Sequence, residues 1–252
     1  MKTKLKSIVT ALFLITTLIS CNKTTQNTQT TVKNDTISKS AAPLVEKVLT
    51  AEQQAALTPD VVLQSLKDGN KRFMNNQITA RDHSAMVRNS ANGQYPKAVI
   101  LSCLDSRIPV EDVFDKGIGD LFVARVAGNI VNEDILGSME YGCKVSGAKL
   151  ILVLGHQSCG AVKSAIDEVK LGNITELLSK IKPAVTESQN FKGEKTSKDK
   201  NYVDEVGRNN VLNAIEMIKT KSPVLEEMLA KKEIRIVGGY YDMTTGEVKF
   251  ME

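Results

Sequence analysis

Four short apolar runs alternate along the chain with segments in which apolar residues have helical spacing. The runs are "KAVILSC" (97–103), "DLFVARV" (120–126), "AKLILVLGH" (148–156) and "EIRIVGGYYD" (233–242). A continuous apolar run of this length is typical of a parallel strand that is covered on both faces. The shorter run "GEVKF" (246–250) predicts a last, antiparallel strand at the edge of the same sheet.

Helical signals lie before and between these runs. Within 57–76, Thr58 is the expected N-cap and Pro59 the first helical residue, with Val62 and Leu66 on one face. We expect further helices over 132–145, directly after 156, near 202–221 and around 223–231, with a polar segment up to about residue 200. Strands that alternate with helices predict an α/β fold, with a mainly parallel central sheet of four strands, an antiparallel edge strand and helices on both faces.

The N-terminus has the pattern of a targeting segment. "MKTKLKSIVTALFLITTLISC" has three lysines at its start and then an apolar run from Ile8 to Ile19. That run is too short for an ordinary spanning helix, so we predict a signal peptide over 1–20. A plain secretory signal without lipidation, or a buried helix, are the alternatives.

The residues around Cys21 suggest a lipid anchor. Leu-Ile-Ser (18–20) before Cys21 resembles the lipobox of bacterial lipoproteins, in which the cysteine is diacylated and becomes the new N-terminus. The resemblance implies an extracytoplasmic protein anchored at Cys21 on the periplasmic face of a membrane. Asn22 and Lys23, which follow it, favour the outer membrane over the inner one.

Residues 22–42 are rich in Thr, Asn, Ser and Lys and contain few large apolar side chains. Such a stretch cannot bury enough surface to offset the entropy lost on ordering. We therefore expect a flexible polar tether over 21–50 and a single domain over 51–252.

The charge gives no support for nucleic-acid binding. The chain has a formal net charge of +4, which falls to +1 without residues 1–20 because three lysines lie there. The basic stretch "FKGEKTSKDK" (191–200) has no interleaved aromatic residues, so a solvated loop explains it better.

Three potential metal ligands follow the predicted strands. Cys103 ends the first strand, and His156 and Cys159 follow the third. Because sites in open α/β sheets form at the carboxyl ends of the strands, we expect these side chains to converge. Two thiolates and one imidazole suit Zn²⁺, and three protein ligands leave the open fourth position of a catalytic site.

Asp105 and Arg107 lie just beyond Cys103 and are two positions apart, so in an extended loop they point the same way. The guanidinium can hold the carboxylate ionised, and an ionised carboxylate only accepts hydrogen bonds. Asp105 could accept a hydrogen bond from a hydroxide on the metal, or swing in as a fourth ligand. An ordinary surface salt bridge is the plainer alternative.

These residues carry a resemblance to a known family. "SCLDSR" together with "GHQSCGAV" resembles the β-class carbonic anhydrases, whose pattern is Cys-x-Asp-x-Arg followed by His-x-x-Cys. Further matching stretches are "DGNKRF", "GIGDLFVARVAGN", "GSMEYG" and "VGGYYD". The resemblance implies one zinc per chain on Cys103, His156 and Cys159, an Asp105–Arg107 dyad that orients the zinc-bound hydroxide, and reversible hydration of CO₂ to bicarbonate and a proton.

Within that family the chain resembles the plant-like type with an open site. The resemblance implies that Gln94, Phe122, Tyr141 and Gly160 contact the substrate. The other type carries a tryptophan that builds an allosteric bicarbonate pocket, and this chain has no tryptophan. Since two thiolates already neutralise the metal, we expect activity to rise toward alkaline pH.

The resemblance also implies an assembly. Family members form dimers or larger assemblies in which an N-terminal helical arm, here 57–76, wraps the partner, and Phe122 and Tyr141 could reach across. A hydrolase of carbonyl sulfide or carbon disulfide, a non-catalytic zinc-binding lipoprotein, and a Cys103–Cys159 disulfide remain alternatives. Cys143 is expected to be a buried apolar residue, and His83 is a proton-shuttle candidate only because histidine is scarce here.

Overall fold

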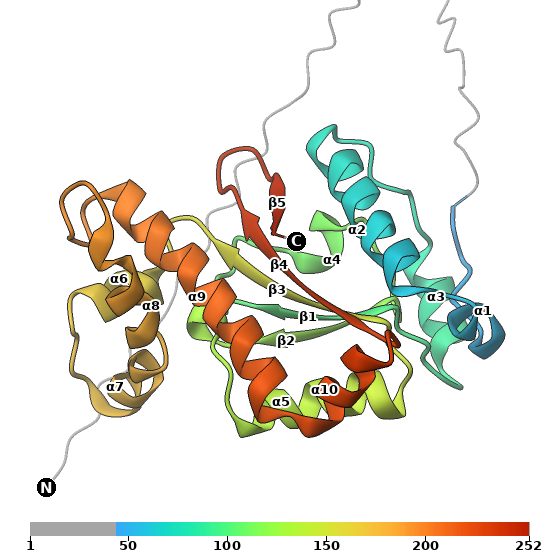
Figure 1. The fold of residues 1–252 in the computed structure, drawn as a ribbon. Helices are drawn as coiled ribbons and strands as arrows, with labels where there is room; N and C mark the ends of the chain where they lie inside the picture. The colour runs from blue at the N-terminus through green and yellow to red at the C-terminus, as the bar shows by residue number, and fades with distance from the viewer. Residues whose placement is uncertain (1–43, 252) are drawn as a thin grey trace, which may run out of the picture. The chain divides into compact units, whose positions relative to one another are not determined.

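A five-stranded sheet forms the centre of the computed structural model, which describes residues 44–251. Its strands are β1 Ala98–Ser102, β2 Leu121–Arg125, β3 Leu150–His156, β4 Arg235–Tyr241 and β5 Val248–Met251. They lie in the order β2-β1-β3-β4-β5 (Figure 1). The first four are mutually parallel, and β5 is antiparallel to β4. The predicted sheet is confirmed, including its antiparallel edge strand.

Ten α-helices surround the sheet in the described part of the chain. They are α1 Ala51–Ala55, α2 Pro59–Met74, α3 His83–Ser90, α4 Val110–Val113, α5 Glu133–Glu140, α6 Gly160–Ile166, α7 Gly172–Ser179, α8 Lys182–Glu187, α9 Lys200–Lys221 and α10 Pro223–Ala230. Thr58 caps α2 by accepting a hydrogen bond from the Val61 N–H, as its position predicted. No helix among the described residues has both the length and the apolar character needed to cross a membrane.

The strands are apolar throughout because both faces of the sheet are covered. Val99 and Leu101 of β1 pack with residues of α9 and α10, whereas Ala98 and Ile100 pack with residues of α2 and α4 on the other face. Figure 1 shows α5, α9 and α10 together on one side of the sheet and α2 and α4 on the other. Alternate residues of one strand therefore serve two separate cores.

A third core cluster lies beyond the carboxyl ends of the central strands. It contains Cys103 and Cys159 together with apolar residues of α6, α8 and the first turns of α9. Helices α7 and α8 correct the expectation of a merely polar segment before residue 200. They form because Leu178, Ile181 and Ala184 are buried against this cluster, a pattern too sparse to stand out among the polar residues around it.

One predicted helix changes its type before its predicted end, and another is short. The helix predicted over 132–145 is capped by Asn132 as expected, but it continues from Tyr141 to Val145 as a π-helical turn. The helix after residue 156 ends at Ile166, before Val169, because Glu168 has the left-handed backbone conformation with φ 53°.

The N-terminal predictions lie mostly outside the described residues. The signal peptide over 1–20, the lipidation of Cys21 and most of the tether over 21–50 therefore stay predictions. The last seven residues of that tether are described, and they contact the domain. Val45 forms a bridge with Arg81, and Thr50 caps α1.

Candidate metal centre

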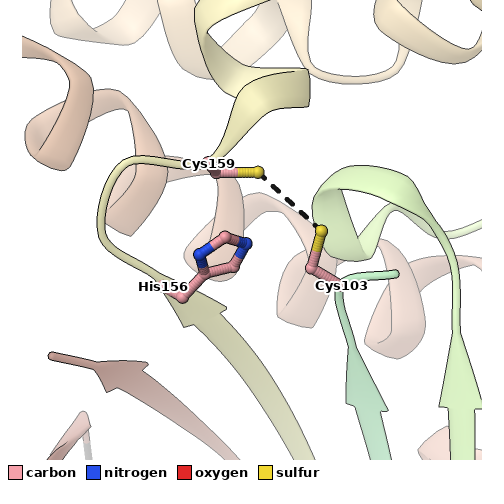
Figure 2. A group of neighbouring side chains, drawn as sticks. All are labelled: Cys103, His156 and Cys159. Carbon is pink, nitrogen blue, oxygen red and sulfur yellow. Dashed lines mark hydrogen bonds between the residues drawn. The ribbon is translucent and has the colours of Figure 1, made fainter. Parts of the chain in front are cut away.

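The three predicted ligands converge at the carboxyl ends of β1 and β3. Cys103 directly follows β1, His156 is the last residue of β3, and Cys159 directly precedes α6. All three are buried, and their ligand atoms lie within 4.8 Å of one another. Figure 2 shows Cys103 at the end of one strand, facing His156 and Cys159, which come from the end of another strand and the loop that follows it.

The spacing of the two thiols fits a tetrahedral metal. The Sγ atoms of Cys103 and Cys159 are 3.9 Å apart. Two Zn–S bonds of about 2.3 Å at a tetrahedral angle place their sulfur atoms roughly 3.8 Å apart. The ion therefore fits between the thiols without a large rearrangement.

His156 presents a free nitrogen to the same space. Its Nδ1 lies 2.9 Å from the Gln157 carbonyl oxygen, and donation to that oxygen leaves Nε2 with its lone pair. Nε2 is buried and has no hydrogen-bond partner within the described residues. A buried polar atom is costly without a partner, so a metal bond at Nε2 would remove that cost.

The loop from His156 to Cys159 is fixed by its own contacts. Ser158 has a left-handed backbone with φ 56°, which turns the chain sharply between the two ligands. The Gln157 side chain donates to Asp242 and accepts from the Met243 N–H. Both ligands are therefore held on a backbone that is tied to the end of β4.

The two thiols differ in their acidity. A hydrogen bond from the Cys159 thiol lowers the pKa of Cys103 to about 4, although burial acts against it. The same bond and burial raise the pKa of Cys159. Since a thiolate is the form that binds zinc, metal binding would release the remaining proton of the pair.

Asp105 and Arg107 form the predicted pair beside this cluster. The Arg107 Nε and Nη2 donate to Oδ1 and Oδ2 of Asp105 at 2.9 and 2.7 Å, and the Arg107 N–H also donates to Oδ1. These hydrogen bonds lower the pKa of Asp105 to about 2. The Asp105 Oδ2 lies 3.9 Å from His156 Nε2, so an ionised carboxylate borders the space between the ligands.

Arg125, which the sequence did not single out, ties this loop to the sheet. At the end of β2, its Nε donates to the Cys103 carbonyl at 3.1 Å and its Nη2 donates to the Asp105 carbonyl. It ends a strand that is paired with β1, and Arg125 lies opposite Ser102 in the register. The sequence did contain a signal for this role. Arg125 is a cationic residue near the end of a predicted strand that lies beside the strand leading to Cys103.

The geometry agrees with comparisons to known proteins. A family profile described as "Carbonic anhydrase" matches residues 98–248. Carbonic anhydrase 2 of Mycobacterium tuberculosis is 34% identical over 197 residues, covering 75% of this chain and 90% of that protein. A carbonic anhydrase of Mycolicibacterium smegmatis is 36% identical over 197 residues, covering 76% and 92%. The chain belongs to the β-carbonic anhydrase family.

Solved β-carbonic anhydrases share the fold. The Coccomyxa enzyme in complex with acetazolamide has a TM-score of 0.58 and 25% identity, covering 66% of this chain and 76% of that chain. The β-carbonic anhydrase CcaA has a TM-score of 0.60 and 24% identity, covering 75% and 86%. Enzymes of this family use zinc, and the Cys103, His156 and Cys159 cluster has the ligand types and spacing for it.

Three of the residues that are expected to contact the substrate lie away from the metal cluster of their own chain. Phe122 pairs with Val99, four residues before Cys103, which is about 13 Å along the strand. Phe122 and Tyr141 line a cavity of about 510 Å³ between β2 and α5, and Gln94 lines another of about 340 Å³. Their contact with substrate stays a prediction.

The remaining candidates have simple positions. Gly160 is the exposed first residue of α6, and a side chain there would meet no atom within 4 Å. His83 is exposed at the start of α3. Cys143 is buried in the core beneath β1, as expected, and burial raises the pKa of its thiol to about 12.

Proposed function

We propose that this protein catalyses the reversible hydration of CO₂ to bicarbonate and a proton. One observation supports this most directly: the buried Cys103, His156 and Cys159 cluster has the ionised Asp105 carboxylate at its border. The spacing of the ligand atoms suits zinc, and the carboxylate stands where it can act on a reacting water. The family to which the chain belongs carries the same activity in its name.

Zinc on these three ligands, one per chain, supplies the Lewis acidity that makes water nucleophilic near neutral pH. The carboxylate of Asp105 is then the group that orients this water. Because its pKa is about 2, it is ionised at neutral pH and accepts a hydrogen bond without donating one. The lone pair of the water oxygen is thereby directed at the CO₂ carbon.

Arg107 keeps this carboxylate in place. The two hydrogen bonds from its guanidinium occupy Oδ1 and one side of Oδ2, so Asp105 is held back from becoming a ligand itself. Arg125 fixes the backbone of the same loop through the carbonyls of Cys103 and Asp105. The guanidinium of Arg107 thus holds the carboxylate, and that of Arg125, at the end of β2, holds the backbone of the loop.

We also propose a homo-oligomer, a dimer or a tetramer, in which a partner completes the apolar side of the site. Phe122 and Tyr141 are supported as partner-facing residues because they line an open cavity at the edge strand β2, away from their own metal cluster. Tyr141 is 55% exposed, so its ring is accessible to a partner.

The N-terminal segment also supports a proposal for where in the cell the protein is held. Lipidation at Cys21 would hold the enzyme at the periplasmic face of a membrane, with the outer membrane favoured by Asn22 and Lys23. The support is the order of a basic start, an apolar run and a cysteine in the sequence. Incorporation of a labelled fatty acid that is lost in Cys21→Ser tests this part.

The decisive experiment measures CO₂ hydration by stopped flow and zinc content on the same sample. The full chain would be used with Cys21→Ser, which leaves it without lipid. We expect fast hydration with one zinc per chain, and loss of both zinc and activity in Cys159→Ala. Stoichiometric zinc without hydration would contradict the proposed function and would direct attention to carbonyl sulfide, carbon disulfide or a structural role for the metal.

A further inference from the structure

The turn at Ala127–Asn129 links the metal cluster to the middle of α9. Gly128 donates its N–H to the Sγ of Cys103 at 3.3 Å. The carbonyl of the same glycine accepts a hydrogen bond from Asn210 Nδ2 at 2.8 Å. Two buried hydrogen bonds through one residue therefore connect Asn210 to a predicted zinc ligand.

Gly128 has little freedom to move between these two bonds. Its φ of 71° lies in the left-handed region, which favours glycine. A Cβ at this position would lie 2.6 Å from Ile181 Cδ1 and 3.1 Å from the Ala161 Cβ. The turn is packed closely against neighbouring side chains, so a shift of its carbonyl also shifts its N–H.

Asn210 is an unusual residue for its place in α9. The buried face of this helix is otherwise mainly apolar, formed by Val203, Val206, Val211, Ala214, Ile215 and Ile218 among others. Asn210 itself is only 3% exposed. Burying an amide among apolar side chains is costly unless it is paired, and the hydrogen bond to the Gly128 carbonyl provides that partner.

We propose that Asn210 is a positioning residue for the Cys103 thiolate and that it sets the affinity of the cluster for zinc. By fixing the Gly128 carbonyl, the amide holds the Gly128 N–H against the sulfur. A hydrogen bond from a backbone N–H stabilises the charge on a thiolate and fixes its direction. The inference rests on the metal site of the proposed function and adds a determinant of that site from α9.

The test replaces the amide with an apolar side chain of similar size. In Asn210→Leu the donor is lost while the branching and the number of side-chain heavy atoms are kept. Zinc affinity is measured by competition with a chromophoric chelator, using zinc alone as the probe and the full chain with Cys21→Ser. We expect the dissociation constant to rise several-fold, toward the roughly 10-fold effect of removing a direct partner of a metal ligand, because Asn210 acts through Gly128.

The same helix offers two matched controls. Asn213, one turn further along, has a buried Nδ2 without a hydrogen-bond partner in the described part of the chain. Asn209 donates to the Ser188 hydroxyl at 2.8 Å, so Asn209→Leu loses a bond of equal length that does not lead to Cys103. We expect zinc affinity close to that of the wild type in both Asn213→Leu and Asn209→Leu.

A spectroscopic readout separates positioning from general loss of stability. In the cobalt-substituted protein, the thiolate-to-metal absorption bands should shift in Asn210→Leu and stay unchanged in the two controls. If Asn210→Leu does not fold, Asn210→Ala and Asn213→Ala are compared in the same way. The wild type loaded with cadmium-113 should also show scalar coupling between the metal and the Gly128 amide proton.

The inference is overturned if the zinc affinity and the cobalt spectrum of the Asn210 variants match those of the controls. Absence of the cadmium coupling to Gly128 would also overturn it. The proposed function can fail separately, because a wild type that binds zinc without hydrating CO₂ still allows the affinity comparison. Conversely, a fully active enzyme with unchanged affinity in Asn210→Leu would remove only this inference.

Discussion

The carboxylate of Asp105 and the guanidinium of Arg107 form a two-point ion pair across a separation of only two residues, at 2.9 and 2.7 Å. The pair closes a small loop directly after Cys103. The oxygen nearer to the ligands, Oδ2, lies 3.9 Å from His156 Nε2. A carboxylate in this position is near enough to act on a water at the metal and is held too firmly to turn away.

The first prediction concerns this carboxylate. Asp105→Asn keeps the shape of the side chain, but it loses the charge and half of the accepting capacity that orient the nucleophilic water. We expect kcat/KM for CO₂ hydration to fall about 100-fold or more. This is the usual effect of losing a side chain that positions or transfers a proton in the transition state. Zinc content should stay unchanged, because Asp105 is not one of the three ligands.

A matched control is Asp68→Asn, at an exposed carboxylate that lies 3.7 Å from Lys71 on α2. Its activity should equal that of the wild type. Asp105→Asn with full activity, or with its zinc lost, would show that the carboxylate has a different role.

A second prediction concerns acid stability and a different carboxylate. Burial disfavours ionisation of Asp115, but hydrogen bonds from Arg72, Thr79 and Arg81 outweigh it and lower its pKa to about 2. The pKa in the folded state is thus below the unfolded value of about 3.9. This contribution to stability is fully present above pH 4 and is lost as the pH falls toward 2.

Asp115→Asn should therefore lower the free energy of unfolding at pH 7 by about 2 kcal/mol or more, since one pKa unit corresponds to about 1.4 kcal/mol. Urea unfolding of the wild type and of Asp115→Asn should be measured between about pH 7 and 3. The difference between their free energies of unfolding should become smaller as the pH falls. Asp60→Asn, which breaks an exposed pair with Arg235, should cost no more than about 1 kcal/mol. If the difference between the wild type and Asp115→Asn grows as the pH falls, the pKa of Asp115 is not lowered in the folded state.

The third prediction is the pH dependence of the reaction. Two thiolates neutralise the charge of a zinc ion that three histidines would leave positive, so water at this site is acidified less than in a three-histidine site, where its pKa is about 7. Activity should rise toward alkaline pH. Stopped-flow rates of the wild type that are flat between about pH 6 and 9 would be incompatible with this ligand set.

The fourth prediction follows from the distance between the ligand sulfurs. The Sγ atoms of Cys103 and Cys159 are 3.9 Å apart, and a disulfide requires about 2.05 Å, so a small movement suffices. After zinc is removed by a chelator, oxidised glutathione should take two electrons and two protons from these thiols and leave a Cys103–Cys159 disulfide. Zinc-loaded protein should resist, because both sulfurs are then bound to the metal.

Thiol titration under denaturing conditions checks this outcome. The metal-free protein should lose two thiols on oxidation, while Cys143 remains because it lies in a different core cluster from Cys103 and Cys159. Peptide mapping identifies the bridge. The same loss of thiols in zinc-loaded protein would show that the metal does not protect them.

Much of the fold follows from local patterns. The apolar runs of β1 and β3 are buried at every position, so their composition alone marked them as covered strands. The convergence of Cys103, His156 and Cys159 followed from one rule, namely that the carboxyl ends of parallel strands meet. Asp105 and Arg107 pair within the same loop, so their contact was also readable from spacing.

The remaining features depend on contacts between distant residues. The hydrogen bond from Asn210 to Gly128 joins positions 82 residues apart, and nothing local to α9 indicates it. Helices α7 and α8 owe their place to a few apolar residues packed on the third core cluster. The proposed role of Phe122 and Tyr141 involves a second chain, and no pattern within one chain can position a partner.

The last prediction tests that second chain. If Phe122 and Tyr141 of one subunit complete the site of another, two inactive variants should complement each other. Cys159→Ala lacks a ligand but keeps Tyr141, whereas Tyr141→Arg keeps the ligands but introduces a charge where an apolar pocket wall is expected. A mixed dimer then contains one site with intact ligands and an intact partner.

Mixing the two variants under conditions that exchange subunits should restore CO₂ hydration that neither shows alone. Val145→Arg is the matched control for Tyr141→Arg, because Val145 is 70% exposed on the same π-helical turn but does not line the cavity between β2 and α5. It should leave activity unchanged. If Tyr141→Arg is inactive and its mixture with Cys159→Ala stays inactive although mixed dimers form, Tyr141 acts within its own subunit. The partner-completed site would then be wrong.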